Sequence, residues 1–338
     1  MKAITPFRVV GGVVIALVVT FVILLKIETG DYLLTPDIAH PVAPLVHVAD
    51  AKPAKGGGEL YFVDVQEQKE TELDHLFPWL HPHSARLPAQ ALIPPGSTDK
   101  AFVQAELREM ATSQKIAAAV ALRHAGYHVV VRPNGVRVDQ IGLDTDAAGK
   151  LQPTDVIVAV NGKPTLTMDA LQAVMAKVNP GETVTLRIRR GTTPLTKRIE
   201  TYNSGGDARI GFLPAQSVEI GKLPLKIRID SGNIGGPSAG LAFTLQVLRR
   251  LGEDVTHGYK VAATGTIGLD GSVGPIGGIE QKTWGVRDSG AQVFLVPKGG
   301  DNAREAMKFA GPNLKIIPVT SLEQALRALA GLHKPPNE

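Results

Sequence analysis

Residues 224–252, PLKIRIDSGNIGGPSAGLAFTLQVLRRLG, contain a strand, a glycine-rich loop and a helix in direct succession. The alternation of apolar residues up to Asp230 predicts a half-buried strand. Three glycines within residues 231–236 predict a loop, because glycine allows backbone angles that other residues resist. After Pro237, apolar residues at nearly every position predict a buried helix that ends at Gly252.

Ser238 stands at the start of this helix, within the run GPSAG at residues 236–240. Such a hydroxyl faces unpaired backbone N–H groups and the positive end of the helix dipole. We expect the N–H groups of Gly236 and Ser238 to stabilise the oxyanion of a tetrahedral intermediate. The alternative is that Ser238 only caps the helix, which is the usual role of serine at this position.

The same run fits the Gly-x-Ser-x-Gly nucleophile elbow of α/β-hydrolases. That elbow needs a strand that leads almost directly into the serine, followed downstream by an acid and then a histidine. Here a six-residue loop separates the strand from Ser238, and only His257 and His333 follow. These surroundings disfavour the elbow.

A second predicted helix covers residues 279–289, and Lys282 lies on its apolar side. Ile279, Lys282 and Val286 have the spacing of one helix face. A lysine there either extends its ammonium group to the edge of the core or is desolvated with a lowered pKa. A serine needs a base and an amine is a base only when neutral, so Ser238 and Lys282 are candidate nucleophile and base.

Two sequence runs, in this order and spacing, resemble the proteolytic domain of Lon-type serine–lysine proteases. They are GPSAG at residues 236–240 and the run from TGTI to GPIGGIEQK within residues 264–282. The resemblance extends roughly over residues 210–329. It implies that Ser238 is the nucleophile, that Lys282 is the general base, and that Thr264 helps to hold the lysine.

The chain departs from typical Lon sequences at two positions, because Gly235 and Thr266 stand where those sequences have acidic residues. It also has no Gly-x-x-x-x-Gly-Lys-Ser/Thr phosphate loop. The resemblance therefore implies a Lon-like peptidase without an ATPase, with no nucleotide and no other cofactor. Lon-type domains commonly form rings, so a homo-oligomer agrees with the resemblance.

The middle of the chain resembles a PDZ domain of the bacterial protease type, on residues 135–138 and 151–164. Residues 169–178 would form its peptide-flanking helix and residues 182–201 its closing hairpin. PDZ domains capture extended peptides by adding a strand to a sheet edge. The two hypotheses are that this unit presents polypeptide substrates, or that it is a rigid spacer.

A strand at residues 59–65 and a long amphipathic helix that begins near Phe102 precede this unit. Lon proteolytic domains have such a strand and helix before the nucleophile strand, so we predict that the PDZ-like unit is inserted between Gly126 and Ile210. The predicted fold class is α+β: a Lon-type proteolytic domain with an inserted PDZ-like, β-rich domain and one N-terminal transmembrane helix. The predicted divisions are 1–26 cytoplasmic stub and membrane anchor, 27–57 linker, 58–126 N-terminal part of the protease domain, 127–205 PDZ-like domain, 206–331 Lon-type proteolytic domain, and 332–338 disordered tail.

The N-terminus predicts the location of the protein. Residues 9–25 carry no charge and lie between Arg8 and Lys26, which is at the short end of a membrane span. The basic residues before this segment favour a cytoplasmic N-terminus, with the bulk of the chain outside the cytoplasm. A cleaved signal peptide is the alternative, but the residues after Lys26 offer no small-residue cleavage site.

Composition and scattered histidines exclude several other functions. The absence of cysteine excludes disulfides, thiol catalysis and cysteine-ligated metals, and a net charge of +4 gives little support to nucleic-acid binding. His75, His81 and His83 lie in a proline-broken segment, and we expect no metal there. The sequence thus predicts a membrane-anchored, ATP-independent serine endopeptidase that cleaves unfolded or exposed protein segments. The alternative is a membrane-tethered, catalytically silent binding scaffold.

Overall fold

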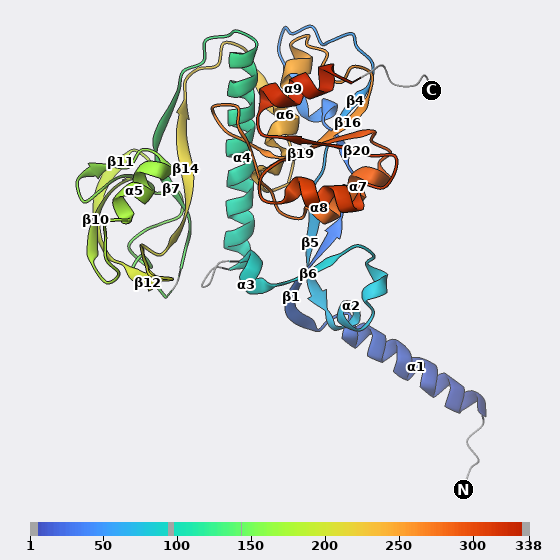
Figure 1. Ribbon diagram of the computed structural model, residues 1–338. Coiled ribbons are helices and arrows are strands. Elements are labelled where there is room, and N and C mark those ends of the chain that lie inside the picture. The colour runs from blue at the N-terminus through green and yellow to red at the C-terminus, as the bar shows by residue number, and fades with distance from the viewer. Residues whose placement is uncertain (1–5, 94–97, 143, 333–338) are drawn as a thin grey trace.

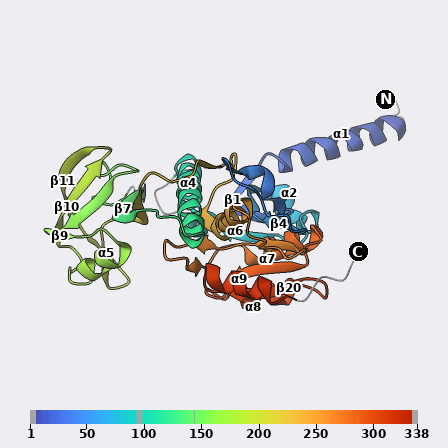
Figure 2. The same ribbon diagram turned by 90° about the horizontal axis from the view of Figure 1, so that it is seen from above.

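The computed structural model of the chain describes residues 6–93, 98–142 and 144–332. The architecture is mixed α and β, and it has a main body and a β-rich unit, which we define as residues 131–220. The long helix α4 (Asp99–His124) stands between the two (Figures 1 and 2). The chain enters the β-rich unit through β7 (Val131–Ile141) and leaves it through β14 (Phe212–Ile220).

The main body is built on a five-stranded sheet in the order β2-β4-β16-β19-β20. The last four strands are parallel, and β2 is antiparallel to β4. Parallel strands covered on both faces are apolar throughout, and β19 is buried along its whole length. The strands are β2 (His40–Pro41), β4 (Glu59–Phe62), β16 (Lys260–Ala263), β19 (Val293–Pro297) and β20 (Lys315–Val319).

Each face of this sheet packs against its own set of helices, because successive side chains of a strand point to opposite faces. Val261 and Ala263 lie in a core with α4, α6 and α9, whereas Ala262 lies in a core with α7 and α8. The two candidate helices therefore flank the sheet on opposite faces. Their bounds are α6 (Gly240–Arg250), α7 (Ile279–Asp288), α8 (Asn302–Phe309) and α9 (Leu322–Ala330).

Segments before and after the β-rich unit share one core. Strand β4 pairs with β16 in parallel, and α4 packs against α6. These are the contacts that an insertion between Gly126 and Ile210 requires.

The β-rich unit has its own sheet, in the order β11-β10-β8-β7-β14, and its own apolar core. Helix α5 (Met168–Met175) contacts β7 and β14. The predicted flanking helix and closing hairpin are both present. The remaining strands of the unit are β8 (Val156–Val160), β9 (Lys163–Pro164), β10 (Thr183–Arg190), β11 (Thr193–Glu200), β12 (Tyr202–Ser204) and β13 (Asp207–Arg209).

Arg137 of β7 joins the β-rich unit to α4. Its guanidinium donates to Glu109 at 2.9 Å, to Thr112 at 3.0 Å and to Asp139 at 2.6 Å. Burial, followed by the neighbouring Asp139, raises the pKa of Glu109 to about 8. These hydrogen bonds link α4, which packs in the core of the main body, to the β-rich unit.

The linker predicted over residues 27–57 is wrong for residues 28–48, which form β1, β2, η1 and β3. Val42 and Val46 are fully buried in the main core, so this proline-rich segment packs on the body instead of spanning solvent. Composition alone cannot separate an extended linker from an extended strand. The elements here and after are β1 (Glu28–Pro36), β2, η1 (Ala43–Leu45), β3 (Val46–Val48), β5 (Val65–Thr71), α2 (Glu72–Leu76), η2 (Pro78–Leu80), β6 (Ala85–Pro88) and α3 (Ala89–Leu92).

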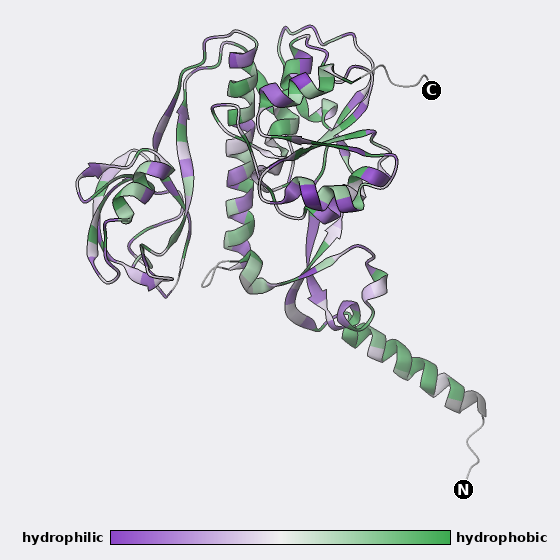
Figure 3. Ribbon diagram, viewed as in Figure 1, coloured by the Kyte–Doolittle hydropathy of each residue, from purple (hydrophilic) through white to green (hydrophobic). Residues whose placement is uncertain are grey.

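Helix α1 (Pro6–Leu24) extends away from the body (Figure 1), and its residues are apolar along most of its length (Figure 3). Within the part of the chain that the structure describes, no helix combines the length and the hydropathy that crossing a membrane requires. The anchor predicted over residues 9–25 is therefore not supported. The predicted disordered tail lies outside the described residues from 333 onward.

Candidate active site

Ser238 is the second residue of η3 (Pro237–Ala239), a short 3-10 turn that leads into α6. Strand β15 (Ile227–Ile229) comes before it, and the glycine-rich loop lies between them as predicted. Gly236 has φ +78°, a backbone angle that L side chains rarely adopt, so glycine is required there. The Ser238 carbonyl accepts the N–H of Gly265 at 2.7 Å, which ties η3 to the end of β16.

Helix α4 holds the loop from its other side. The Gly236 N–H donates to the Glu106 carbonyl at 2.9 Å, and the Ser113 hydroxyl donates to the Pro237 carbonyl at 3.1 Å. The Gly236 N–H is thus already paired, which corrects the predicted oxyanion hole. Of the two predicted donors, the N–H of Ser238 is the one that stays a candidate.

Lys282 lies within hydrogen-bond distance of Ser238. Its Nζ donates to the Ser238 Oγ at 2.8 Å, and the lysine is only 4% exposed. Ile279 and Val286 are buried on the same face of α7, as the spacing predicts. The amine therefore does not extend to solvent, which excludes the snorkelling alternative.

Burial lowers the pKa of the Lys282 amine from 10.5 to about 8. The negative charges of Asp64, Glu67 and Glu106 act in the opposite direction and keep the pKa from falling further. An amine with this pKa is partly neutral near physiological pH. It can accept a proton from a hydroxyl at 2.8 Å.

Thr264 lies in the site with a different contact from the one predicted. Its hydroxyl donates to the Ser238 carbonyl at 3.2 Å, and the residue is fully buried. It follows directly after β16, whose end abuts η3. Thr264 therefore supports the backbone of the serine, whereas the resemblance had implied support of the lysine.

Ser238 and Lys282 line a cavity of about 700 Å³. Much of its wall is apolar, so it suits an aliphatic or aromatic chain. Three acidic side chains also line it, two at the beginning of β5 or just before it and one from α4. The apolar side chains include Leu34, Leu87, Leu92, Phe102, Leu107, Ile234 and Ile276, and the acidic ones are Asp64, Glu67 and Glu106.

The three carboxyl groups were missed by reasoning from the sequence. Desolvation raises the pKa of each of them, and Asp37 adds to the effect on Asp64 as Glu67 adds to that on Glu106. One signal was available, because Glu106 lies four residues from Phe102 and four from Met110. It is therefore a carboxylate on the apolar face of a predicted helix.

His75, His81 and His83, where we expect no metal, each lie against another side chain. The His81 Nε2 is 3.0 Å from the Asp74 Oδ1, His75 is 3.7 Å from the Glu70 carboxylate, and the His83 ring stacks on Trp284.

A different trio has ligand atoms close enough for a metal. The ligand atoms of Asp37, His40 and Asp64 lie within 4.8 Å of one another. In this trio the His40 Nε2 is 3.4 Å from the Asp37 Oδ2. Acidic groups often come this close without binding a metal ion, so we assign no metal to this trio.

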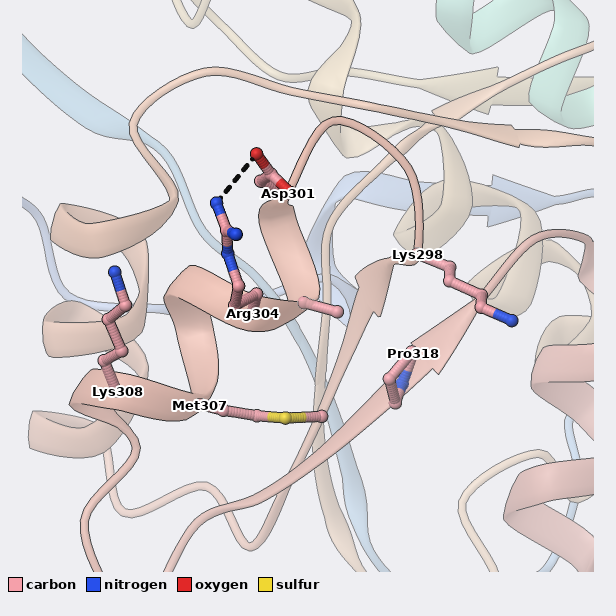
Figure 4. Close-up of a pocket in the computed structure, with 7 residues that line it drawn as sticks. Lys298, Asp301, Arg304, Met307, Lys308 and Pro318 are labelled. Carbon is pink, nitrogen blue, oxygen red and sulfur yellow. Dashed lines mark ion pairs between the residues drawn. The ribbon is translucent and has the colours of Figure 1, made fainter.

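A second cavity, of about 520 Å³, is formed by α8 and the ends of β19 and β20 (Figure 4). Arg304 pairs with Asp301 there at 2.9 Å, and Lys298 and Lys308 lie beside them. Its seven lining residues include no hydroxyl or thiol group. It is therefore no candidate for nucleophilic catalysis.

Comparison with known proteins places families on both parts of the chain. Residues 219–331 match the Lon protease (S16) C-terminal proteolytic domain, and residues 146–190 match a PDZ domain. The Lon protease of Clostridium beijerinckii is 34% identical over 128 residues, which are 36% of this chain and 16% of that protein. The Lon protease of Chloroflexus aggregans is 29% identical over 163 residues, 44% of this chain and 19% of that protein.

The chain thus spans less than a fifth of the length of these relatives. Among solved structures, the PDZ domain of the SdrC-like protein from Listeria innocua is 24% identical, with a TM-score of 0.23. That match covers 24% of this chain and 92% of the domain. The chain contains a Lon-type proteolytic domain and a PDZ domain, and homology to the former supports a serine protease.

Proposed function

We propose that this chain is an ATP-independent serine endopeptidase that uses Ser238 as nucleophile and Lys282 as general base. The observation that carries the proposal is the 2.8 Å contact between the Lys282 Nζ and the Ser238 Oγ at the wall of a cavity. Burial of the amine provides the second requirement, a base that is partly neutral near pH 8. Independence from ATP stays a prediction, which the assay below tests.

The reaction is an acyl transfer in two halves. Neutral Lys282 takes the hydroxyl proton as the Ser238 Oγ bonds to the carbonyl carbon of the scissile peptide. The C–N bond then breaks, and the Lys282 ammonium returns that proton to the leaving amine. In the second half a water gives a proton to Lys282 and attacks the ester. The carbon–Oγ bond breaks, the acid product leaves, and Ser238 recovers its proton.

The oxyanion of the tetrahedral intermediate needs a hydrogen-bond donor near the Ser238 Oγ. We propose the backbone N–H of Ser238, which lies at the beginning of η3 and α6, where helical N–H groups point out of the helix. The Ser113 hydroxyl donates to the Pro237 carbonyl, which is in the same peptide group as this N–H. Thr264 and Gly265 donate to the Ser238 carbonyl in the next peptide group, so the backbone is held on both sides of Ser238.

The β-rich unit is suited to presenting an extended segment of substrate. Strand β14 is the last strand in its sheet order, and a groove of about 570 Å³ lies between α5 and residues 206–214. An extended chain can add to such an edge through backbone hydrogen bonds, with its side chains in the groove. This supports peptide presentation over the rigid-spacer alternative.

The location in the membrane stays a prediction from the sequence. The side chains of α1 include many exposed apolar groups, among them Ile15, Leu17 and Phe21. Alkaline extraction of membranes from cells that make the full chain tests it directly. Release of the protein into the soluble fraction, or a mature N-terminus beyond Gly30, contradicts an anchor.

The endopeptidase proposal is tested with the full chain in detergent and an unfolded, reduced protein as substrate, in the absence of ATP. We expect the wild type to cleave this substrate and ATP to have no effect. Ser238→Ala and Lys282→Met should each lower the rate at least on the order of a thousandfold. Circular dichroism should show both variants folded. An intact substrate after incubation with wild-type protein favours the silent-scaffold alternative.

A further inference from the structure

The cavity beside Ser238 contains two carboxylates that have no partner in the described part of the chain. Neither Glu67 nor Glu106 makes a hydrogen bond or an ion pair with any of the described residues. Glu70 and Glu109, in contrast, have partners. Glu70 accepts from Thr29 at 2.8 Å and contacts Arg86, and Glu109 accepts from Arg137 at 2.9 Å.

Glu106 lies directly against the nucleophile loop. A methyl group at Gly236 would meet the Glu106 Oε2 at 2.8 Å, and one at Gly235 would meet the Glu106 Cβ at 2.7 Å. The two glycines therefore admit this side chain next to the loop that carries Ser238. Its carboxylate therefore lies beside the loop that carries the nucleophile and lines the same cavity as Ser238.

The charges in the cavity do not balance among themselves. Among the described residues that line the cavity, Lys282 is the only basic one, and its amine contacts the Ser238 hydroxyl. In the neutral form that the mechanism requires, Lys282 gives no compensating positive charge. Desolvation raises the pKa of Glu106, and the charge of Glu67 raises it further, so these carboxylates lie within reach of each other's field. A bound cation would offset the repulsion between the two carboxylates.

The apolar part of the cavity wall can accommodate the aliphatic part of a long side chain. Phe102 and Leu107 lie on either side of Glu106 along α4, and Leu87 and Leu92 are among the other lining residues. An apolar wall beside carboxylates is the environment in which lysine and arginine bury their aliphatic stems and pair their charges. The hydrogen-bonded Ser238 and Lys282 locate the site independently of these acids.

We propose that Glu106 and Glu67 select substrates with a lysine or arginine immediately before the cleaved bond. This inference rests on the proposed endopeptidase function and names the substrate class of the same site. Glu106 makes the nearer contact beside the nucleophile loop. Glu67, an exposed residue of β5 that lines the same cavity, pairs with the same cation.

The test uses two fluorogenic peptides that differ only in lysine or norleucine before the cleaved bond. The quantity measured is the ratio of kcat/KM for the two peptides on the same protein. A variant that alters Lys282 changes kcat/KM for both peptides by the same factor, because both are cleaved by the same dyad. That factor cancels in the ratio. We expect the wild type to prefer lysine roughly tenfold to a hundredfold, the range of a hydrogen bond to a charged group.

Glu106→Gln should lower this ratio at least about tenfold, and Glu67→Gln should lower it by less. Glu323→Gln is the matched control, since it makes the same chemical change on an exposed residue at the start of α9. A wild-type ratio at or below one, or a ratio unchanged in both cavity variants, overturns the inference. In that case cleavage of either peptide by the wild type, lost in Ser238→Ala, leaves the endopeptidase proposal standing. Cleavage of neither peptide overturns both.

Discussion

Replacing Lys282 with methionine should stabilise the protein at neutral pH while it removes activity. The amine is buried and mostly protonated at pH 7, and folding lowers its pKa from 10.5 to about 8. At about 1.4 kcal/mol for each pH unit, this costs the folded state roughly 3 kcal/mol. Methionine fills a similar volume without charge, but it loses the hydrogen bond to Ser238, worth about 1 kcal/mol. We expect a net gain of about 2 kcal/mol in the free energy of unfolding at pH 7.

The dependence on pH separates this effect from simple repacking. Between pH 8 and pH 10.5 the unfolded wild type binds a proton at Lys282 that the folded protein does not. The wild type therefore gains stability relative to Lys282→Met as the pH rises through this window, and the penalty is fully present below it. Urea unfolding followed by circular dichroism at pH 7 and pH 10 should show the difference shrinking by roughly 2 kcal/mol. A difference that is constant with pH would refute the reasoning.

Two further outcomes follow from the same geometry. The kcat/KM of the wild type should rise with pH through a midpoint near 8, because the free enzyme needs neutral Lys282. Glu106→Gln should lower this midpoint, since the Glu106 charge raises the Lys282 pKa. A kcat/KM that falls with pH through this range is incompatible with a lysine base. Thr264→Val removes the hydroxyl that donates to the Ser238 carbonyl, so it should lower the free energy of unfolding by about 1 kcal/mol and lower kcat. A moved pH midpoint with unchanged stability would mean that Thr264 acts on the lysine instead.

The parts of the site that have a local signal were predicted from the sequence. Glycine and proline mark the turn into α6, and helical spacing places Lys282 on the buried face of α7. The strand at β4 and the long helix α4 were also predicted, as was their place before the nucleophile strand. These signals come from residues close together in the sequence, so they can be recognised before the fold is known.

What was missed depends on contacts between segments far apart in the chain. The Gly236 N–H is paired with Glu106, and Thr264 contacts the serine carbonyl. Neither partner can be identified before α4 and β16 are placed beside η3. The packing of residues 28–48 was missed for the same reason, because Val46 is recognised as core only when β3 lies beside β15.

The claim that an amine is kept partly neutral beside the Ser238 hydroxyl can be measured without substrate. Lysine labelled with ¹³C at Cε gives a resonance that follows the protonation of Nζ, and Lys282→Met identifies the resonance of Lys282 by its absence. The account predicts a titration midpoint near 8 for this lysine in the folded wild type. A midpoint near 10.5, where an exposed lysine titrates, would contradict it.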